Sequence, residues 1–172
     1  MKRVRIVTFG LCLTLLAGIV VGARAEAAQP LEPTVSCDRI VLRARTGIED
    51  GFRILLGAVS VPASRHLSQG AAATQSPRWP YFRNAGFAVR GGTAAVSVTV
   101  PEGWRDRVAV SWGGSPASSS LRFAPCGGSP ARTWNAYSGG FHLRSRGDCV
   151  PLIVRVGGLS TTVRVGVGRV CG

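Results

Sequence analysis

The chain is 172 residues long and carries 21 lysine and arginine residues against eight aspartate and glutamate residues, a formal net charge of +13. This length suits one domain with a single hydrophobic core. A nucleic-acid-binding protein would gather its basic residues with aromatic residues on one element. The arginines here are scattered singly, so nucleic acid is not an expected partner.

The N-terminus has the layout of a secretory signal peptide. The basic start MKRVR is followed by an apolar run over residues 6–22 and by an Ala-x-Ala sequence that ends at Ala25. We therefore predict a signal peptide at 1–25, a short linker at 26–36 and one folded domain at 37–172. The protein is expected to be secreted or associated with the cell envelope. The alternative is an uncleaved segment in which residues 6–22 anchor it to a membrane, and membrane contact is expected only in this way.

The chain that follows the predicted signal peptide is strongly basic. Four of the 21 basic residues precede residue 26, so seventeen remain, all of them arginine, against eight acidic residues. Because most of these arginines alternate with apolar residues, we interpret them as the solvated face of a sheet. An exported protein with this surplus is attracted to polyanions such as teichoic acids, anionic lipid or acidic glycans.

Four cysteines follow the predicted signal peptide: Cys37, Cys126, Cys149 and Cys171. An even number in an exported chain predicts disulfides, and four cysteines allow three pairings. Since Cys37 opens the first predicted strand and Cys171 is next to the last residue, we expect Cys37–Cys171 to join the two ends. Cys126–Cys149 would then close the segment between them. No pair has Cys-x-x-Cys spacing and no histidine adjoins a cysteine, so we predict no metal site and no cofactor.

From Cys37 onward the hydrophobic pattern has a period of two, with glycine-rich turn sequences between the runs. The alternating runs cover residues 39–45, 96–100, 108–112, 121–123, 150–156 and 163–167. FRILLGAVSV, residues 52–61, is more uniformly apolar and is predicted to be one strand covered on both faces. The pattern predicts an all-β fold, an antiparallel β-sandwich that is immunoglobulin-like in the broad sense. A small closed β-barrel is the alternative.

Residues 64–84 interrupt this pattern. The first part, 64–78, is small and polar and is predicted to be a flexible insertion between two strands. The second part, RWPYFR, brings Trp79, Tyr81 and Arg83 together in sequence. Aromatic rings beside guanidinium groups are what a binding platform for sugars or aromatic ligands uses. The alternative is a loop whose aromatic side chains fold back over one end of the sandwich.

Catalytic motifs are scarce. There is no Gly-x-Ser-x-Gly sequence, and Glu49 and Glu102 fall in predicted turns. The two histidines, His66 and His142, would have to supply any general base of this type, and neither lies in a recognised motif. We therefore predict no catalytic residue, and a secreted hydrolase with a site near residues 64–84 is kept as an alternative.

The segment WNAYSGGFHLRSRGDC ends in an Arg-Gly-Asp triplet at residues 146–148. A three-letter motif arises readily by chance in a chain this rich in arginine and glycine, so we do not predict adhesion from it. The letters before it are more informative. Trp134 and Tyr137 are predicted aromatic anchors, and Gly139 and Gly140 are typical of a β-bulge or a close approach between strands.

Several segments share a pattern with a known group of proteins. These segments are RWPYFRNAGFAVRGG, VPEGWRDRVAVSWGG, LRFAPC, WNAYSGGFHLRSRGDCVPLIVRVGG and VRVGVGRVC, and they span roughly Phe52 to Cys171. An aromatic-Gly-Gly-Phe sequence lies between two cysteines, and the chain closes on a cysteine. This arrangement resembles a group of uncharacterised exported or membrane-anchored actinobacterial proteins. The resemblance implies no activity, ligand or catalytic residue.

Together these features predict an exported, non-catalytic binding or structural module of the cell envelope that contacts anionic envelope polymers or glycans. The secreted hydrolase and a purely structural or assembly domain are the alternatives. Exposed aromatic and arginine side chains would favour the binding module. A histidine hydrogen-bonded to a hydroxyl or carboxylate in a cleft would favour the hydrolase, and buried aromatic residues would favour the structural domain.

Overall fold

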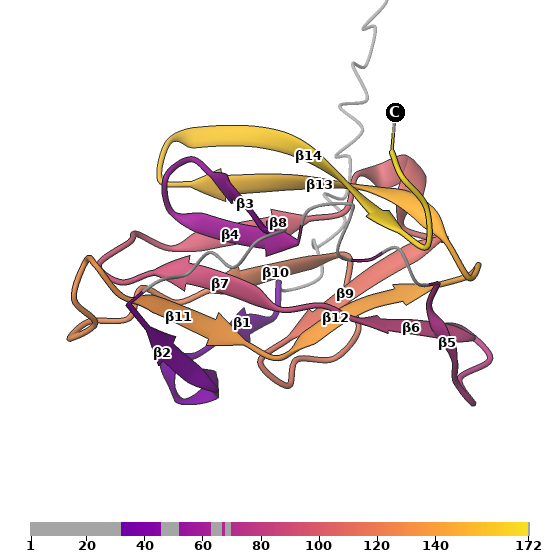
Figure 1. Cartoon of the computed structure of the whole chain (residues 1–172), viewed down its shortest axis with the longest axis horizontal. Helices are drawn as coiled ribbons and strands as arrows, with labels where there is room; N and C mark the ends of the chain where they lie inside the picture. Colours follow the sequence, from indigo (N-terminus) through magenta and orange to yellow (C-terminus); the bar gives the residue numbers. More distant parts are fainter. Residues whose placement is uncertain (1–31, 46–51, 63–66, 68–69, 172) are drawn as a thin grey trace, which may run out of the picture. The chain divides into compact units, whose positions relative to one another are not determined.

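The computed structural model describes residues 32–45, 52–62, 67 and 70–171, which belong to one compact unit. The predicted signal peptide and the alternative anchor at residues 6–22 lie outside the described residues. The described chain forms fourteen β-strands and two short 3-10 helices, η1 (Cys37–Arg39) and η2 (Glu102–Trp104). Figure 1 shows how the strands are arranged. Within this part of the chain, no helix is long and apolar enough to cross a membrane.

The strands form three sheets. Sheet A has the order β1 (Thr34–Val35), β10 (Ser120–Phe123), β8 (Val96–Thr99), β13 (Asp148–Val156) and β14 (Leu159–Val167). Sheet B has the order β2 (Leu42–Ala44), β11 (Trp134–Tyr137), β7 (Phe87–Arg90), β4 (Val59–Pro62) and β3 (Phe52–Leu55). Sheet C has the order β5 (Ala72–Ala73), β6 (Tyr81–Asn84), β12 (Gly139–Leu143) and β9 (Val108–Trp112). Apart from the parallel pair β1 and β10, the strand pairs are antiparallel, and no sheet of the described residues closes into a barrel. The fold is therefore the predicted β-sandwich.

Two stretches of chain run through sheets C and B in succession (Figure 1). β11 continues through Ser138 into β12, and β6 continues through Ala85 and Gly86 into β7. At this crossing Gly139 has a φ of +145°, and a Cβ atom there would lie 1.9 Å from the carbonyl oxygen of Ser111. The N–H of Ala85 donates to the carbonyl of Gly139 at 2.8 Å. The close strand approach predicted from the two glycines is confirmed.

The hydrophobic core contains residues of all three sheets. Its largest side chains are aromatic and at most 1% exposed: Phe87, Trp112, Phe123, Tyr137 and Phe141. Phe123 of sheet A stacks on Phe87 of sheet B with ring centroids 4.6 Å apart, and meets Tyr137 edge-on at 5.0 Å. Full burial of a ring of this size contributes about 2–3 kcal/mol. Tyr137 is therefore a core anchor, as predicted.

Trp134 is buried outside this core cluster. Because side chains alternate along a strand, Trp134 points to the opposite face of β11 from Tyr137. The guanidinium group of Arg90 lies over its ring at 5.0 Å from the centroid. Trp134 thus anchors the outer face of sheet B beneath an arginine.

The predicted single strand at 52–61 is a hairpin of β3 and β4. The chain reverses at Leu56 and Gly57, which have φ angles of 50° and 63°. Three residues separate the paired positions Leu55 and Val59, and the N–H of Ala58 donates to the carbonyl of Leu55 at 3.0 Å. Positive φ at both central residues of the turn gives it the twist that antiparallel strands favour. Leucine seldom adopts this conformation, so the apolar sequence of this segment did not indicate a turn. β4 is nevertheless buried at all four positions, as predicted for a strand covered on both faces.

Two segments that were predicted to be irregular contribute strands. β1 lies within the predicted linker at 26–36, and its Val35 is buried opposite Phe123 of β10. In the predicted insertion at 64–78, β5 pairs with β6, and Leu67 joins the core. The described residues of this segment therefore include a short edge strand and a core residue, which its composition did not indicate. Small, polar composition indicated a loop, but alanine can lie on an edge strand when a longer strand is available to pair with it.

The two disulfides join Cys37 to Cys126 and Cys149 to Cys171, each with a Cα–Cα distance of 5.6 Å. The predicted pairs Cys37–Cys171 and Cys126–Cys149 are wrong. The parallel pairing of β1 with β10 carries Cys37 alongside the chain that leads to Cys126. The β13–β14 hairpin sets Cys149 opposite Gly166, close to the C-terminal cysteine. Disulfides indicate an oxidising, extracytoplasmic environment.

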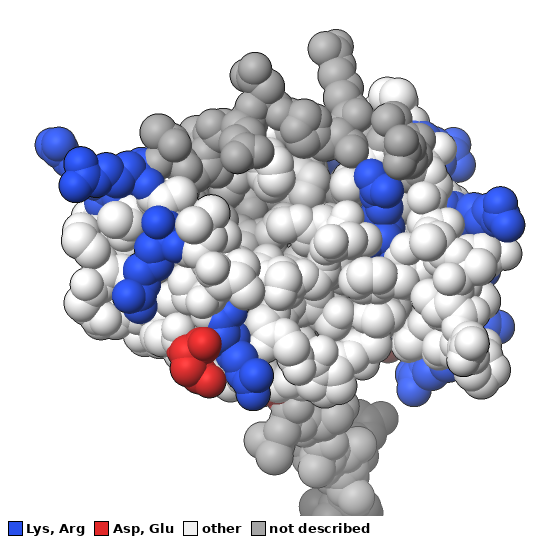
Figure 2. Space-filling model, turned by 60° about the horizontal axis from the view of Figure 1, so that its bottom comes forward, with Lys and Arg blue, Asp and Glu red and all other residues white. Residues whose placement is uncertain are grey.

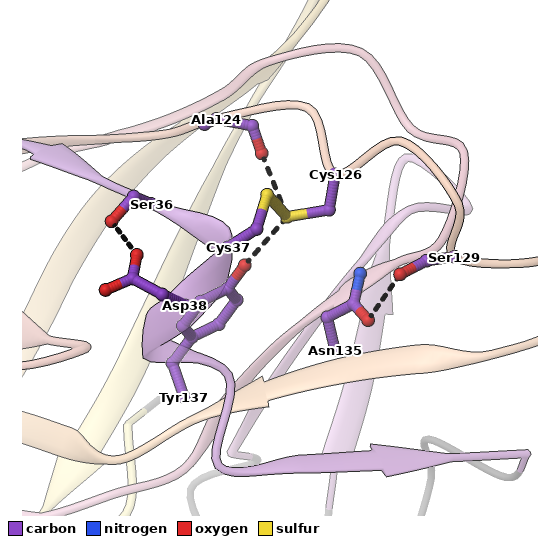
Figure 3. The surroundings of a disulfide bond; sticks show 8 residues. All are labelled: Ser36, Cys37, Asp38, Ala124, Cys126, Ser129, Asn135 and Tyr137. Atoms are coloured by element: carbon purple, nitrogen blue, oxygen red, sulfur yellow. Dashed lines mark hydrogen bonds between the residues drawn. A yellow bond between two sulfur atoms is a disulfide. The ribbon is translucent and has the colours of Figure 1, made fainter.

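The Cys37–Cys126 bridge lies against Tyr137 (Figure 3). The Tyr137 hydroxyl is 3.6 Å from the sulfur of Cys126, and burial raises the pKa of this tyrosine. Beside the bridge, the hydroxyl of Ser36 donates to Asp38 and lowers the pKa of that carboxyl group. The disulfide therefore ties the N-terminal strand to the aromatic core rather than to the C-terminus.

Candidate functional site

The predicted platform of Trp79, Tyr81 and Arg83 is not an exposed aromatic surface. Trp79 is only 7% exposed, and the guanidinium group of Arg78 lies over its ring at 5.5 Å. Tyr81 and Arg83 are half-buried on β6 and pair with core residues of β12, so both lie on the inward side of sheet C. Strand alternation turned these side chains inward, and the alternative of aromatic residues folding back is closer to the structure.

Beside Trp79 lies a hollow of about 380 Å³, which we call the arginine cleft. It is lined by Arg78, Trp79, Arg105, Asp106, Arg107 and Arg144. The four arginines are all exposed, and they come from segments far apart in the sequence. The lining therefore contains four guanidinium groups and one carboxylate.

Backbone hydrogen bonds bring these segments together. Arg105 and Arg107 lie in the turn between η2 and β9, which is closed by bonds from the N–H of Arg105 to Glu102 and from the N–H of Arg107 to Trp104. Arg144 follows β12, and its N–H donates to the carbonyl of Arg107 at 3.0 Å, which extends the β9–β12 ladder by one residue. Two of the arginines thus lie directly opposite one another at the end of sheet C.

Side-chain contacts hold the cleft in shape. The guanidinium group of Arg107 lies 4.2 Å from the ring centroid of Trp104 and donates to the carboxylate of Asp148 at 2.6 Å. Arg144 donates to the carbonyl of Arg78 at 3.3 Å. Arg107 is therefore charge-compensated by Asp148, and three further arginines face only one carboxylate in the lining, that of Asp106. The cleft keeps a positive surplus suited to an anion.

Asp148 is the last residue of the Arg-Gly-Asp triplet, and its place in the fold decides how the triplet is interpreted. It is 8% exposed, it pairs with Arg107, and one of its oxygens accepts the N–H of Cys149 at 2.9 Å. Arg146 lies over the ring of Tyr81 at 5.8 Å. The triplet therefore has a buried, ion-paired aspartate, and we assign it a structural role.

A second polar feature is a pair formed by Ser111 and His142. The serine hydroxyl and Nε2 of the histidine are 2.7 Å apart, and both side chains are half-buried. The Phe82 ring packs against the imidazole with centroids 4.8 Å apart. Burial lowers the pKa of His142 below its ordinary value of 6.5, which favours the neutral ring at pH 7. A neutral imidazole beside a hydroxyl has the geometry of a base and a nucleophile.

The sequence did not point to these residues. Arg105, Arg107 and Arg144 looked like members of a scattered set, and Ser111 stands in no motif. Spacing in the sequence gave no signal, because strand pairing alone brings these positions together. His142 was a candidate base, whereas the other candidate, His66, lies outside the described residues.

Two arginines of sheet A fit the predicted solvated sheet face. Arg122 and Arg155 are exposed on sheet A, where both pair with Ser97, and they line a separate hollow of about 320 Å³. Figure 2 shows a face on which basic side chains stand apart from one another, separated by uncharged surface. The arginine cleft differs because its guanidinium groups surround a single hollow.

No family model, curated protein or solved structure matches this chain. Among the described residues, no group of three or more histidine, cysteine, aspartate or glutamate side chains could hold a metal ion.

Proposed function

We propose that this protein is an exported binding module of the cell envelope whose arginine cleft holds anionic polymers or acidic glycans. The observation that carries the proposal is the gathering of Arg78, Arg105, Arg107 and Arg144 around one hollow whose lining contains a single carboxylate. Guanidinium groups present several N–H donors in a planar fork that matches phosphate and carboxylate oxygens. Both groups are the repeating charges of envelope polyanions.

The chemistry of the cleft favours charge recognition over sugar stacking. Trp79 is buried beneath Arg78, and Trp104 is covered by Arg107. A sugar ring would therefore meet guanidinium groups before it met an aromatic face. Binding is expected to weaken strongly as salt is raised, because exposed charges are screened over about 8 Å at physiological ionic strength. The two disulfides suit a protein that works outside the cytoplasm.

The test compares two double variants that remove the same charge. The protein is exported from a host with its own N-terminal segment, and its binding to polyphosphate, polygalacturonate and neutral dextran is measured by titration. Arg105→Gln with Arg144→Gln is expected to weaken binding to both polyanions by about tenfold or more, since hydrogen bonds to charged groups contribute about 1.5–3 kcal/mol each. Dextran is expected not to bind.

The matched control is Arg122→Gln with Arg155→Gln, which removes two exposed arginines from the other hollow. It is expected to change the affinity by less than about threefold, through net charge alone. Equal losses in the two double variants would contradict a cleft-specific site, because they would show that only the total charge attracts the polymer. Thermal melting of each variant confirms that the fold is intact.

A further inference from the structure

Ser111 and His142 lie on the outward face of sheet C. The inward face of β9 and β12 is fixed by Val108, Val110 and Leu143, which are all fully buried in the core. Side chains alternate along a strand, so Ser111 and His142 point the other way. Their hydrogen bond runs diagonally across the two strands, because His142 pairs directly with Ala109.

Two residues of the arginine cleft, Arg107 and Arg144, adjoin the ends of these two strands. Arg107 directly precedes β9 and Arg144 directly follows β12, two residues beyond His142. The hydrogen bond from the N–H of Arg144 to the carbonyl of Arg107 shows that the pairing register holds up to this row. Two residues of strand span about 7 Å. The backbone of His142 therefore lies about 7 Å along the chain from that of Arg144, whose side chain lines the arginine cleft.

We propose that Ser111 is a nucleophile served by His142 as general base, and that its substrates are acyl esters carried on anionic polymers held by the arginine cleft. This inference rests on the proposed function for its choice of polymer. It adds to that function a covalent step, the removal of acyl groups from the bound chain.

The step balances within the chain, the ester and one water molecule. The oxygen of Ser111 attacks the carbonyl carbon of the ester while its proton passes to Nε2 of His142. The bond to the leaving alkoxide breaks, and His142 returns the proton to that oxygen. Water then attacks the acyl-serine with His142 taking its proton, the carboxylic acid leaves, and the proton returns to Ser111. No oxidant, metal or cofactor takes part.

Three features of the fold suit this role. Partial burial lowers the pKa of His142 below its ordinary value of 6.5, which favours the neutral ring that can accept a proton. Phe82 packs on its ring and limits the orientations that the ring can take. Arg144, two residues beyond His142, places positive charge near this end of β12, which favours the negative charge that develops on the carbonyl oxygen.

The first experiment uses p-nitrophenyl acetate, an uncharged ester, with the exported protein. We expect release of p-nitrophenol and a transient acetyl group on Ser111, located by fragmentation of the tryptic peptide VAVSWGGSPASSSLR. Ser111→Ala and His142→Gln are expected to lower the rate at least tenfold. Ser160→Ala, at an exposed serine of β14, is the control and is expected to leave the rate unchanged. Unchanged rates in both Ser111→Ala and His142→Gln, or acetylation at another serine, would overturn the proposal.

The second experiment separates this proposal from the binding function. Acetylated polygalacturonate and acetylated dextran carry the same ester with and without carboxylates. We expect the protein to release acetate from the anionic polymer at least tenfold faster, and Arg105→Gln with Arg144→Gln to abolish this preference. Ser111→Ala is expected to bind polygalacturonate as the unmodified protein does. If polymer binding fails while acetyl-Ser111 still forms, the proposed function falls and the nucleophile stands. Equal rates on both polymers would overturn the choice of substrate.

Discussion

The two disulfides are predicted to contribute unequally to stability because they close loops of different length. Cys37–Cys126 spans 89 residues and Cys149–Cys171 spans 22. Treated as loop closure in the unfolded chain, these separations correspond to about 4.6 and about 3.4 kcal/mol at 25 °C. Removing the long-range bridge is therefore expected to lower the free energy of unfolding by about 1 kcal/mol more than removing the short-range one.

Burial is expected to widen this difference. Cys126 is buried and its sulfur contacts the hydroxyl of Tyr137, whereas Cys149 and Cys171 are half-exposed near the end of the chain. An alanine at 126 leaves this contact unfilled, and loss of buried atoms costs more than their transfer energy alone. The measurement is urea unfolding of the two Cys→Ala double variants, followed by tryptophan fluorescence. An equal or larger loss from the 149/171 pair would refute the loop-length reasoning.

The pairing itself is checked by a single substitution. Cys37→Ala is expected to leave a free thiol at Cys126, found by alkylation in the tryptic peptide FAPCGGSPAR. Alkylation at Cys171 would instead match the pairing that the positions of the cysteines in the sequence favoured. The two outcomes lie in different peptides, so a single mass map of the non-reduced protein distinguishes them.

Two further predictions concern single residues. Gly139→Ala is expected to cost about 3–5 kcal/mol of unfolding free energy or to prevent folding, because its Cβ would collide with the backbone of β9. A Cβ at Gly158 would meet nothing within 4 Å, so Gly158→Ala should change the free energy of unfolding by less than about 0.5 kcal/mol. Thermal melting of both variants checks this. A loss in Gly139→Ala as small as that in Gly158→Ala would contradict the close approach. For His142, the folded-state pKa is lowered, so the unfolded chain takes up a proton first as pH falls. The free energy of unfolding should therefore decline as the pH falls below about 6.5. His142→Gln should reduce that decline, as measured by urea unfolding at several pH values. An identical pH profile in the variant would contradict the burial of this ring.

The hydrophobic pattern of the sequence predicted strands correctly where the burial of a strand depends on its own residues. Period-two alternation correctly indicated strands such as β8, β9 and β13, because one face of each meets the core whatever its neighbours are. Tyr137 was interpreted correctly for the same reason, since an aromatic residue in such a strand faces the core. The close approach at Gly139 involves the backbone of Ser111 on another strand, and the pair of glycines was its signal in the sequence. The hairpin turn at Leu56 was not predicted because leucine rarely adopts the positive φ that it has there.

The candidate site was less predictable because it depends on which strands are neighbours. The platform expected at Trp79 rested on adjacency in sequence, but Trp79 is buried beneath Arg78, and alternation along β6 turns Tyr81 inward. Arg144 meets Arg107 only because β12 pairs with β9, and the register of that pair also sets Ser111 beside His142. A shift of one residue in the register would place these side chains on opposite faces.

The sequence by itself determined an all-β, disulfide-bonded domain, because alternation and an even cysteine count are properties that each segment carries alone. The tertiary structure decided which cysteines join, which arginines share a cleft and which serine meets the histidine. Those outcomes depend on strand order and register, which arise from contacts between residues far apart in the chain. The sulfur atoms of Cys37 and Cys126, 89 positions apart, are bonded because the two-residue strand β1 pairs with β10.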